Sequence, residues 1–336
     1  MSVTIREVAS RAGVSIATVS RVFNNSDPVD ERTRERVRQA AVELRYVPNV
    51  LGRSLSMRRT DSIGLLLPDL FGEFFSEIIR GCDQTAQKNH YQLLVSSSHN
   101  SRKQIVTAVR MMRGRVDALV IMSPHIDAET LNENLPRTLP VLLLDCRVES
   151  NGFDSLNIDN EKGAAAMTGH LLSHGHTRVA IIKGTEGNVD AADRLKGYCL
   201  AMRERGIAVD ERLQVAGEFT EASGYHAVKT LLAVTPRPTA IFASNDSMAI
   251  GALSALRDEG IQIPEQMALA GFDDVPIGSY LSPALSSVHV GINDMGIKAI
   301  ETVLHAVRNK NAHHKQQILV STSLRLRESC GCTGEH

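Results

Sequence analysis

The 336-residue sequence has no uninterrupted run of 18 apolar residues, and no basic stretch followed by an apolar one at its N-terminus. It therefore predicts neither a membrane-spanning helix nor a secretion leader, and we expect a cytoplasmic location. Only five cysteines occur, an odd number scattered along the chain, which favours reduced thiols over a disulfide framework. Cys330-Gly331-Cys332 has the residue types of a metal or redox site, but it lies in a polar tail without a partner motif, which favours an incidental pair.

Sequence signatures of catalysis are also missing. There is no Gly-rich dinucleotide or phosphate loop, and no Gly-x-Ser-x-Gly nucleophile turn. His170, His174 and His176 have a spacing that suits a metal, but no Glu lies between them and a glycine ends the helix there, which favours a structural or helix-end role. Asp273 and Asp274 could act as an acid–base pair, although neighbours in a turn usually point apart. We therefore expect no enzyme, no cofactor and no metal.

The charge is distributed unevenly along the chain. Residues 1–60 contain eleven Arg and no Lys against six Asp and Glu, a balance of +5, while the whole chain has a net charge of −1. Such a basic end suits attraction to nucleic acid, because neutralising phosphates and releasing counterions supplies most of the affinity. The composition, 43% hydrophobic and 22% charged, is enough for two or three domains with filled cores.

The stretch TIREVASRAGVSIATVSRVFN, residues 4–24, has the pattern of two short helices joined by a turn. Thr4 and Glu7 form a capping box, Gly13 permits the turn, and Ser15 can cap the second helix. The predicted inward stripe of that helix is Ile16, Val19 and Phe23. This arrangement is a helix-turn-helix, whose second helix fits a DNA major groove, or else a plain helical hairpin; the local charge favours the first.

Two further helices are predicted before the chain changes character. A third helix from Glu31 to Leu44, capped by Asp30, alternates Arg with Glu, which suits a solvated face, with phosphate contact as the alternative. Residues 49–56 can form two more turns, too few to be stable alone, so this segment should order only against a partner. The polar residues 57–61 then mark a domain boundary.

From residue 62 onward, short apolar runs alternate with helical stretches such as 73–89. This pattern predicts α/β architecture with parallel sheets buried on both faces, in two half-domains that can form a cleft. Ligands of such sheets lie beyond the carboxyl ends of the strands. The predicted strands are 63–67, 91–95, 118–122, 141–145, 155–159, 179–183, 213–217, 239–243, 267–271 and 286–290.

The turns after these strands are rich in Asp, Asn and Arg, which make charge-assisted hydrogen bonds, and in Phe, whose ring faces suit a sugar or a base. We expect Asn160 and Asp246 to cap the helices that follow. Arg194 lies in an early helical turn after a Gly-rich loop, where its guanidinium can reach a ligand. The alternative for Arg194 is a surface ion pair.

Several motifs, in order over essentially the whole chain, resemble the lactose/galactose-repressor (LacI/GalR) family of bacterial transcription regulators. They are TIREVASRAGVSIATVSRVFNN, YVPNVLGRSLS, IDNEKGAAAMTGHLLSHGHTRVAIIKG, RLKGY, SNDSMAIGAL, GFDDVPIGSYLSPALSSV and LRESCG. The resemblance implies an all-α DNA-binding headpiece at 1–46, a hinge helix and linker at 47–60, and a periplasmic-binding-protein-like core at 61–336. The core would have two parallel-sheet subdomains, an N-subdomain of about 61–160 and 292–322, and a C-subdomain of about 161–291 and 323–336.

The resemblance also implies which side chains meet a double-stranded DNA operator. Arg21 can offer a bidentate fork to a guanine, and Ile16 and Ala17 can offer apolar contact. Leu55 would insert into the central base step from the minor groove, its alternative being a helix-packing leucine. The implied phosphate contacts, which position without reading bases, are Thr4, Ser15, Thr18, Ser20, Asn24 and Tyr46.

The resemblance also implies a small-molecule effector in the core cleft, a sugar or sugar derivative. The matching positions are Phe74, Phe75, Arg194, Phe219, Asn245 and Asp273. Similar proteins use the Arg and the Asp to hold adjacent sugar hydroxyls. The loop here reads LFGEFF, where many sugar-responsive relatives have Asn-Pro, and Glu73 places an acid near the cleft mouth. Purine-like and amino-substituted ligands are therefore alternatives to a plain hexose.

The implied function is that of a repressor that binds a pseudo-palindromic operator as a homodimer, with an affinity set by the effector. The chain ends at His336 without a leucine heptad, which favours a dimer over a tetramer. Two other classes are alternatives. A solute-binding protein without a DNA role would need an export leader and no headpiece, and a sugar-metabolising enzyme would show turnover.

Overall fold

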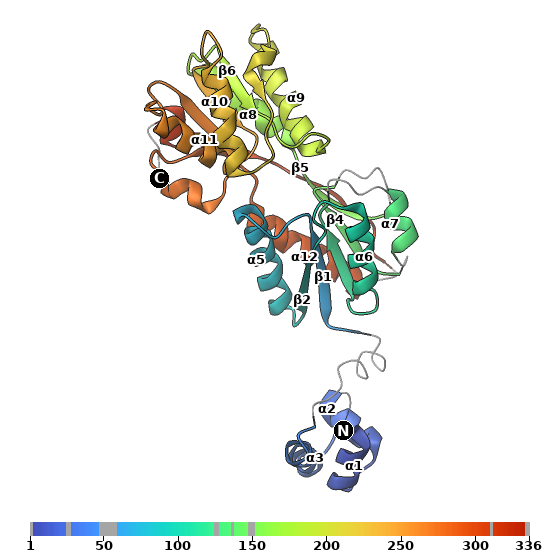
Figure 1. Cartoon of the computed structure of the whole chain (residues 1–336). Coiled ribbons are helices and arrows are strands. Elements are labelled where there is room, and N and C mark those ends of the chain that lie inside the picture. Colours follow the sequence, from blue (N-terminus) through green and yellow to red (C-terminus); the bar gives the residue numbers. More distant parts are fainter. Residues whose placement is uncertain are drawn as a thin grey trace. The chain divides into compact units, whose positions relative to one another are not determined.

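The computed structural model describes residues 3–24, 28–46, 59–123, 128–135, 138–146, 152–309 and 312–332. The chain divides into two compact units, Met1–Thr60 and Asp61–His336 (Figure 1). The predicted hinge helix at 49–56, with Leu55, lies outside the described residues. Within those ranges, every helix is too short or too polar to cross a membrane.

Within the described residues of the N-terminal unit there are three helices, α1 (Ile5–Ala12), α2 (Ile16–Asn24) and α3 (Glu31–Glu43). The predicted starts of α1 and α2 are confirmed. The Glu7 carboxylate accepts a hydrogen bond from the Thr4 backbone N–H at 2.6 Å, and Ser15 Oγ accepts one from the Thr18 N–H at 3.1 Å. Gly13 has a φ of +65°, so a residue without a side chain makes the left-handed turn between the two helices.

Small side chains form the core of this unit, namely Val8, Ala9, Ala12, Val19, Val22, Val37, Ala40 and Ala41. The prediction that Ile16 faces inward is wrong, because its side chain is 45% exposed. Val22, three residues after Val19, takes the buried position, and Phe23 is half-buried. The buried stripe of α2 is therefore rotated from the predicted one, and it leaves Ile16 on the outer surface.

The second unit contains two six-stranded sheets. The first sheet has the order β11-β5-β4-β3-β1-β2, and all of its pairs are parallel. Its strands are β1 (Ser62–Leu67), β2 (Gln92–Ser97), β3 (Ala118–Ile121), β4 (Val141–Leu144), β5 (Asp154–Ile158) and β11 (Gln317–Val320). All four residues of β3 and all four of β4 are apolar and buried, as expected for a parallel sheet with two covered faces. Strand β2, at one edge of the sheet, is partly exposed.

The second sheet has the order β12-β10-β9-β8-β6-β7 and is parallel except where β12 pairs antiparallel with β10. Its strands are β6 (Val179–Ile182), β7 (Gln214–Val215), β8 (Ala240–Ala243), β9 (Ala268–Asp273), β10 (Ser286–His289) and β12 (Ser323–Arg325). The chain passes from the first sheet to the second after β5, returns after β10, and passes over again after β11. The predicted α/β fold is confirmed.

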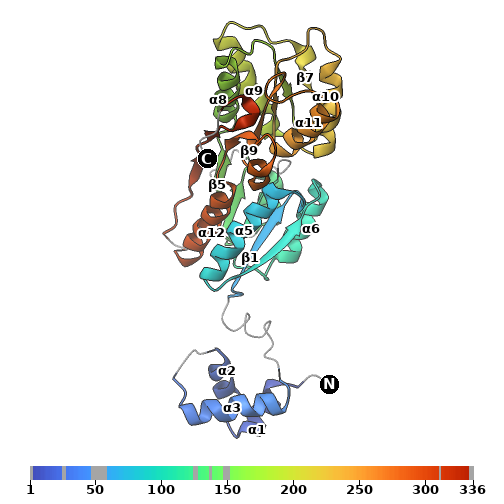
Figure 2. The same cartoon turned by 90° about the vertical axis from the view of Figure 1, so that its left-hand side faces the viewer.

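Helices cover both faces of each sheet (Figures 1 and 2). Those of the first sheet are α5 (Glu73–Lys88) and α12 (Ile292–Arg308) on one face, and α6 (Arg102–Met112) and α7 (Ala128–Asn134) on the other. Those of the second sheet are α8 (Asn160–Ser173) and α9 (Val189–Glu204) on one face, and α10 (Glu221–Leu232) and α11 (Asp246–Asp258) on the other. Short 3-10 turns occupy Glu211–Leu213, Pro276–Tyr280 and Glu328–Cys330.

Candidate functional sites

Three residues predicted to read bases lie on the exposed side of α2. Ile16, Ala17 and Arg21 are exposed, whereas Val19 and Val22 are buried in the core of the unit. The helix thus presents an apolar and a cationic group outward from a packed three-helix support. An arginine in this setting can donate two hydrogen bonds to a guanine, and an exposed isoleucine suits a thymine methyl group.

The starts of α1 and α2 carry three of the predicted phosphate contacts. Thr4 precedes α1 and Ser15 precedes α2, and the free backbone N–H groups of a helix start favour an anion. The Thr4 hydroxyl lies 2.9 Å from the Glu7 carboxylate, and the hydroxyls of Ser15 and Thr18 are 2.9 Å apart. These contacts hold the hydroxyls in place at the two helix starts.

The remaining predicted DNA contacts are Tyr46, Ser20, Asn24 and Leu55, and their surroundings differ. The ring of Tyr46 packs on that of Phe23 with centroids 5.8 Å apart, which fixes it beside the end of α3. Ser20 is half-buried on α2. The side chain of Asn24 and the whole of Leu55 lie outside the described residues, so their predicted roles stay predictions.

A cleft of about 310 Å³ lies within the second unit, among the turns that follow strands of both sheets. All six residues predicted for effector binding belong to its lining, namely Phe74, Phe75, Arg194, Phe219, Asn245 and Asp273. They come from segments as far apart in the sequence as the start of α5 and the end of β9. The structure therefore brings the whole predicted set together.

Arg194, on α9, belongs to the lining of this cleft and is only 5% exposed. Its Nε donates to Asn160 Oδ1 at 2.8 Å, and its Nη1 donates to the Ser244 carbonyl at 2.5 Å. The same Nη1 lies 3.4 Å from Asp273 Oδ1, and the guanidinium stacks 3.8 Å above the Phe272 ring. The alternative of a surface ion pair is wrong, because the group is buried and held from several sides.

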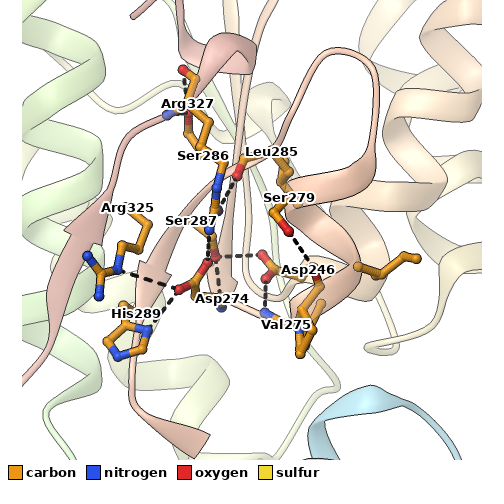
Figure 3. Close-up of polar contacts among 12 residues, drawn as sticks. Asp246, Asp274, Val275, Ser279, Leu285, Ser286, Ser287, His289, Arg325 and Arg327 are labelled. Atoms are coloured by element: carbon orange, nitrogen blue, oxygen red, sulfur yellow. Dashed lines mark hydrogen bonds and ion pairs between the residues drawn. The ribbon is translucent and has the colours of Figure 1, made fainter. Parts of the chain in front are cut away.

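Asp273 ends β9 in a strained turn. Its φ is +108° and that of Asp274 is +59°, both in a region that residues with side chains seldom adopt. Asp246 holds this turn, accepting hydrogen bonds from the Val275 N–H at 2.8 Å and the Ser287 hydroxyl at 2.6 Å (Figure 3). Strain of this kind, supported by a buried carboxylate, is typical of ligand sites.

Asp274 points away from Asp273 and into a separate network. Its carboxylate lies 2.8 Å from His289 Nδ1 and 2.8 Å from Arg327, with Arg325 at 3.9 Å (Figure 3). The prediction that the two neighbouring carboxylates diverge is confirmed. Asp274 fixes the turn from outside, while Asp273 lines the cleft.

The ring of Phe219 packs directly against Gly184. A Cβ on Gly184 would lie 2.1 Å from Phe219 Cζ, so only glycine leaves room for the ring. Asn245 holds this segment as well, since its Nδ2 donates to the Phe219 carbonyl at 3.1 Å and its Oδ1 caps α11 through the Met248 N–H. The Phe219 ring lies 5.9 Å from the Arg194 guanidinium, close enough for a ligand to contact both.

The opposite wall of the cleft carries further aromatic rings and an acid. Phe74 and Phe75 meet edge to face with centroids 5.5 Å apart. Glu73, at the start of α5, accepts a hydrogen bond from the Ile277 N–H at 3.0 Å. α5 covers the first sheet and Ile277 follows β9 of the second, so this contact connects the two halves of the core beside the cleft.

Acidic groups dominate the described lining of the cleft. Seven carboxylates line it against the single guanidinium of Arg194, and they are Asp69, Glu73, Asp145, Asp190, Glu218, Glu221 and Asp273. Burial raises the pKa of Asp273 to about 7, with Asp190 adding to the rise and Arg194 opposing it. Burial, followed by the Asp190 charge, raises the pKa of Asp145 well above its usual range. The cleft thus holds several groups that favour a partner able to donate hydrogen bonds.

Asp145, Asn160 and Asp190 also belong to this region, and none was assigned to effector binding from the sequence. Asn160 Nδ2 donates to Asp190 Oδ1 at 2.9 Å, so these two residues and Arg194 form one chain of contacts. The positions of Asp145 and Asn160 directly after strands were a usable signal. Asp190 lies within the first turn of α9, where no sequence pattern distinguishes it from an ordinary helix-start acid.

The expected capping roles of Asn160 and Asp246 are wrong by one residue. Asp159 caps α8 by accepting from the Lys162 N–H at 3.3 Å, and Asn245 caps α11. Asn160 and Asp246 are the first helical residues instead, with side chains directed to Arg194 and to the Asp273 turn. A polar pair after a strand predicts that one of its two residues caps the next helix. The sequence does not tell which of the two is the cap and which points into the core.

Comparison with known proteins agrees with both units. The family described as "Bacterial regulatory proteins, lacI family" matches residues 4–49, and "Periplasmic binding protein-like domain" matches residues 168–330. The HTH-type transcriptional regulator GalR of Escherichia coli (strain K12) is 37% identical over 91% of this chain and 90% of its own length.

Solved structures match over nearly the full length. A lac repressor dimer bound to operator and the anti-inducer ONPF is 27% identical with a TM-score of 0.86, covering 98% of this chain and 99% of that one. A complex of the transcriptional regulator CelR with cellobiose is 31% identical with a TM-score of 0.72, covering 97% and 99%.

A helix-turn-helix unit followed by a core with a ligand-sized cleft defines a DNA-binding regulator with an effector site. The chain belongs to the LacI family of bacterial regulatory proteins. Members of this family are transcription regulators and not enzymes, and they bind operator DNA as dimers together with small-molecule effectors. The alternative of a solute-binding protein without a DNA role is thereby excluded.

Proposed function

We propose that the protein is a dimeric repressor whose affinity for a pseudo-palindromic operator is controlled by a neutral or amino-substituted sugar in the core cleft. The excess of carboxylates over the one guanidinium in the cleft carries this proposal. An anionic ligand such as a sugar phosphate would be repelled by these groups, whereas hydroxyl and ammonium groups would find acceptors. The related regulator solved with cellobiose supports a sugar as the ligand class.

Arg194 and Asp273 hold adjacent ligand hydroxyls in this proposal. Asp273 Oδ1 is buried and makes no hydrogen bond with a described residue, so a ligand hydroxyl can donate to it. The rings of Phe74 and Phe219 supply apolar faces on which a sugar ring can pack. Phe75 supports Phe74, and Asn245 supports Phe219 through its backbone carbonyl.

On the DNA side, Arg21 supplies most of the base discrimination. Ile16 and Ala17 add apolar contacts, and Leu55 inserts at the centre of the site from the hinge. The ligand acts on this region through the core, because its binding residues come from both halves. A changed arrangement of the halves alters the spacing of the two hinges in the dimer, and therefore the affinity for operator.

A thermal-melt panel of neutral sugars, amino sugars, sugar phosphates and purines tests the ligand class. A ligand at 100 times its dissociation constant contributes about 2.7 kcal/mol, which raises the melting temperature by several degrees. We expect a rise with a neutral or amino sugar and none with a sugar phosphate. The rise should disappear in Arg194→Lys, because lysine lacks the fork that contacts two groups at once.

Arg203→Lys is the matched control, since Arg203 is an exposed residue of the same helix and its side chain donates to the Cys199 carbonyl at 3.3 Å, away from the cleft lining. Stabilisation by sugar phosphates alone would contradict the proposal. Stabilisation by a purine would keep the regulatory role but replace the ligand class, with the Phe74 and Phe219 rings stacking on a base instead of a sugar.

A further inference from the structure

Three side chains that bind soft metal ions meet at the C-terminal end of α8, outside the effector cleft, and a fourth, His174, lies beside one of them. His170 and His174 come from α8, and Cys330 and Cys332 come from the last turn of the described chain. His170 Nε2 lies 3.3 Å from Cys330 Sγ and 3.6 Å from Cys332 Sγ. Cys332 Sγ lies 3.7 Å from His174 Nε2.

The local fold brings the two thiols to this place. Ser329 anchors the preceding turn, donating to the Leu269 carbonyl at 2.6 Å and accepting from the Ser286 N–H at 2.8 Å. Gly331 has a φ of +91°, so the chain reverses between the cysteines and both can face α8. The sequence shows no partner motif near the cysteines, because the histidines beside them lie some 160 residues earlier in the chain.

The distances match the edges of a tetrahedral zinc site. With Zn–S bonds of about 2.3 Å and Zn–N bonds of about 2.0–2.1 Å, a sulfur and a nitrogen ligand are separated by about 3.5 Å. The three N···S distances of 3.3, 3.6 and 3.7 Å scatter around this value. The ligand atoms of His170, Cys330 and Cys332 all lie within 4.8 Å of one another.

The position of the cluster at a helix end also suits a cation. His170 lies in the last turn of α8 and His174 follows directly after it. The C-terminal end of a helix carries the negative end of its dipole, which attracts a cation.

We propose that His170, Cys330 and Cys332 bind one divalent zinc-like ion, with nearby His174 as the fourth ligand, and that this ion links the end of the chain to α8. Binding displaces the thiol protons to solvent and leaves both sulfurs as thiolate ligands. Mixed thiolate and imidazole ligation in a tetrahedron favours zinc over calcium or magnesium, which prefer oxygen ligands. His176 is not a ligand, since its Nδ1 is paired with Thr239 Oγ1 at 3.0 Å.

Cobalt(II) titration of the reduced, metal-stripped, full-length protein without DNA tests this site. We expect one equivalent of cobalt to bind with thiolate-to-metal absorption in the near ultraviolet and tetrahedral bands in the visible, and zinc to displace it. Zinc should also raise the melting temperature, because the folded state gathers the ligands and binds the ion more tightly than the unfolded chain does. Cys332→Ser, at a half-buried position, should weaken binding at least about tenfold while folding normally, and Cys330→Ser should do the same.

Cys199→Ser, a half-buried cysteine on α9, is the matched control and should bind cobalt as the wild type does. The proposal is overturned if the reduced protein binds no stoichiometric cobalt or zinc, or if Cys332→Ser binds as tightly as Cys199→Ser. A Cys330–Cys332 disulfide that forms in air, with no metal bound after reduction, would overturn it too and would assign the pair a redox role.

Discussion

The helix proposed to read DNA and the cleft proposed to bind the effector use opposite physical settings for their functional groups. On α2, Ile16 and Arg21 stand exposed on a support whose core consists mainly of valine and alanine. In the cleft, Arg194 and Asp273 are almost completely buried and held by several partners. The first arrangement keeps recognition independent of folding, whereas the second couples ligand binding to the stability of the core.

The difference has a physical reason. DNA supplies its own charges and hydrogen-bond groups at the surface, so an exposed arginine meets them without prior desolvation of a protein cavity. A small ligand offers few contacts, so its site must be desolvated and arranged in advance. Substitutions on the exposed side of α2 should therefore change DNA binding alone. Substitutions in the cleft should change both effector binding and the stability of the core.

Arg194→Ala should have the largest effect. It removes the partner of buried Asp273 and leaves the Asn160 and Ser244 acceptors without their donor, and breaking a buried pair in this way costs about 3–5 kcal/mol. Urea denaturation of the core transition measures this loss. A stability within about 1 kcal/mol of wild type would mean that the cleft is not coupled to folding. The contrast between the exposed face of α2 and the buried cleft would then be wrong.

Gly184→Ala should break the cleft without touching a charge. The added Cβ would lie 2.1 Å from Phe219 Cζ, so the ring must move, and overpacking of this kind costs about 1–3 kcal/mol. We expect weaker binding of the sugar found by the melt panel, with unchanged operator affinity in its absence. Gly187→Ala is a control at a glycine with open space around it, although its φ of +78° adds some backbone strain.

Arg21→Ala should weaken specific operator binding by about 1–3 kcal/mol and leave the core transition unchanged. Arg38→Ala, which removes the same charge from an exposed position on α3, should lower binding to operator and to random DNA alike. Fluorescence anisotropy with both DNAs separates the two effects. Unchanged discrimination in Arg21→Ala would remove this residue from base reading.

The remaining expected effect is a pH dependence of stability, which is spread over several pH units. The pKa of Asp273 is about 7 in the folded protein, above the usual value of about 3.9 in an unfolded chain. The folded state therefore keeps a proton that the unfolded state releases, so this stabilisation is complete below about pH 4 and is lost as the pH rises to about 7. As the pH rises from about 4 to about 7, the free energy of unfolding of the wild type should fall relative to that of Asp273→Asn. The fall should be at most about 1.4 kcal/mol per pH unit. Parallel curves from pH 5 to 8 would contradict the assigned shift.

Much of this architecture follows from local sequence patterns. Capping at Thr4 and Ser15, the helix from Glu73 and the apolar runs of β3 and β4 are all fixed by nearby residues. Strands β11 and β12 were not predicted, because their apolar runs are short, three residues in β11 and one in β12. Their place is decided by pairing with β5 and β10, which lie far away in the sequence.

The sites were predictable to different degrees for the same reason. The resemblance to a family supplied the six cleft positions, which the structure gathers in one lining. It did not supply Asp190, whose contact with Asn160 depends on how α8 and α9 pack. The predicted buried face of α2 was wrong at Ile16. The apolar residues of α2 can form two different stripes with three- and four-residue spacing, and only the packing of α1 and α3 selects one of them.

Linkage between the two regions is the central claim, and operator affinity measured with and without the sugar identified by the melt panel tests it most directly. The factor by which the sugar changes operator affinity should equal the factor by which operator changes sugar affinity. Arg194→Lys should abolish the effect, and Arg203→Lys should retain it. An operator affinity that stays the same when the cleft is saturated would contradict the claim.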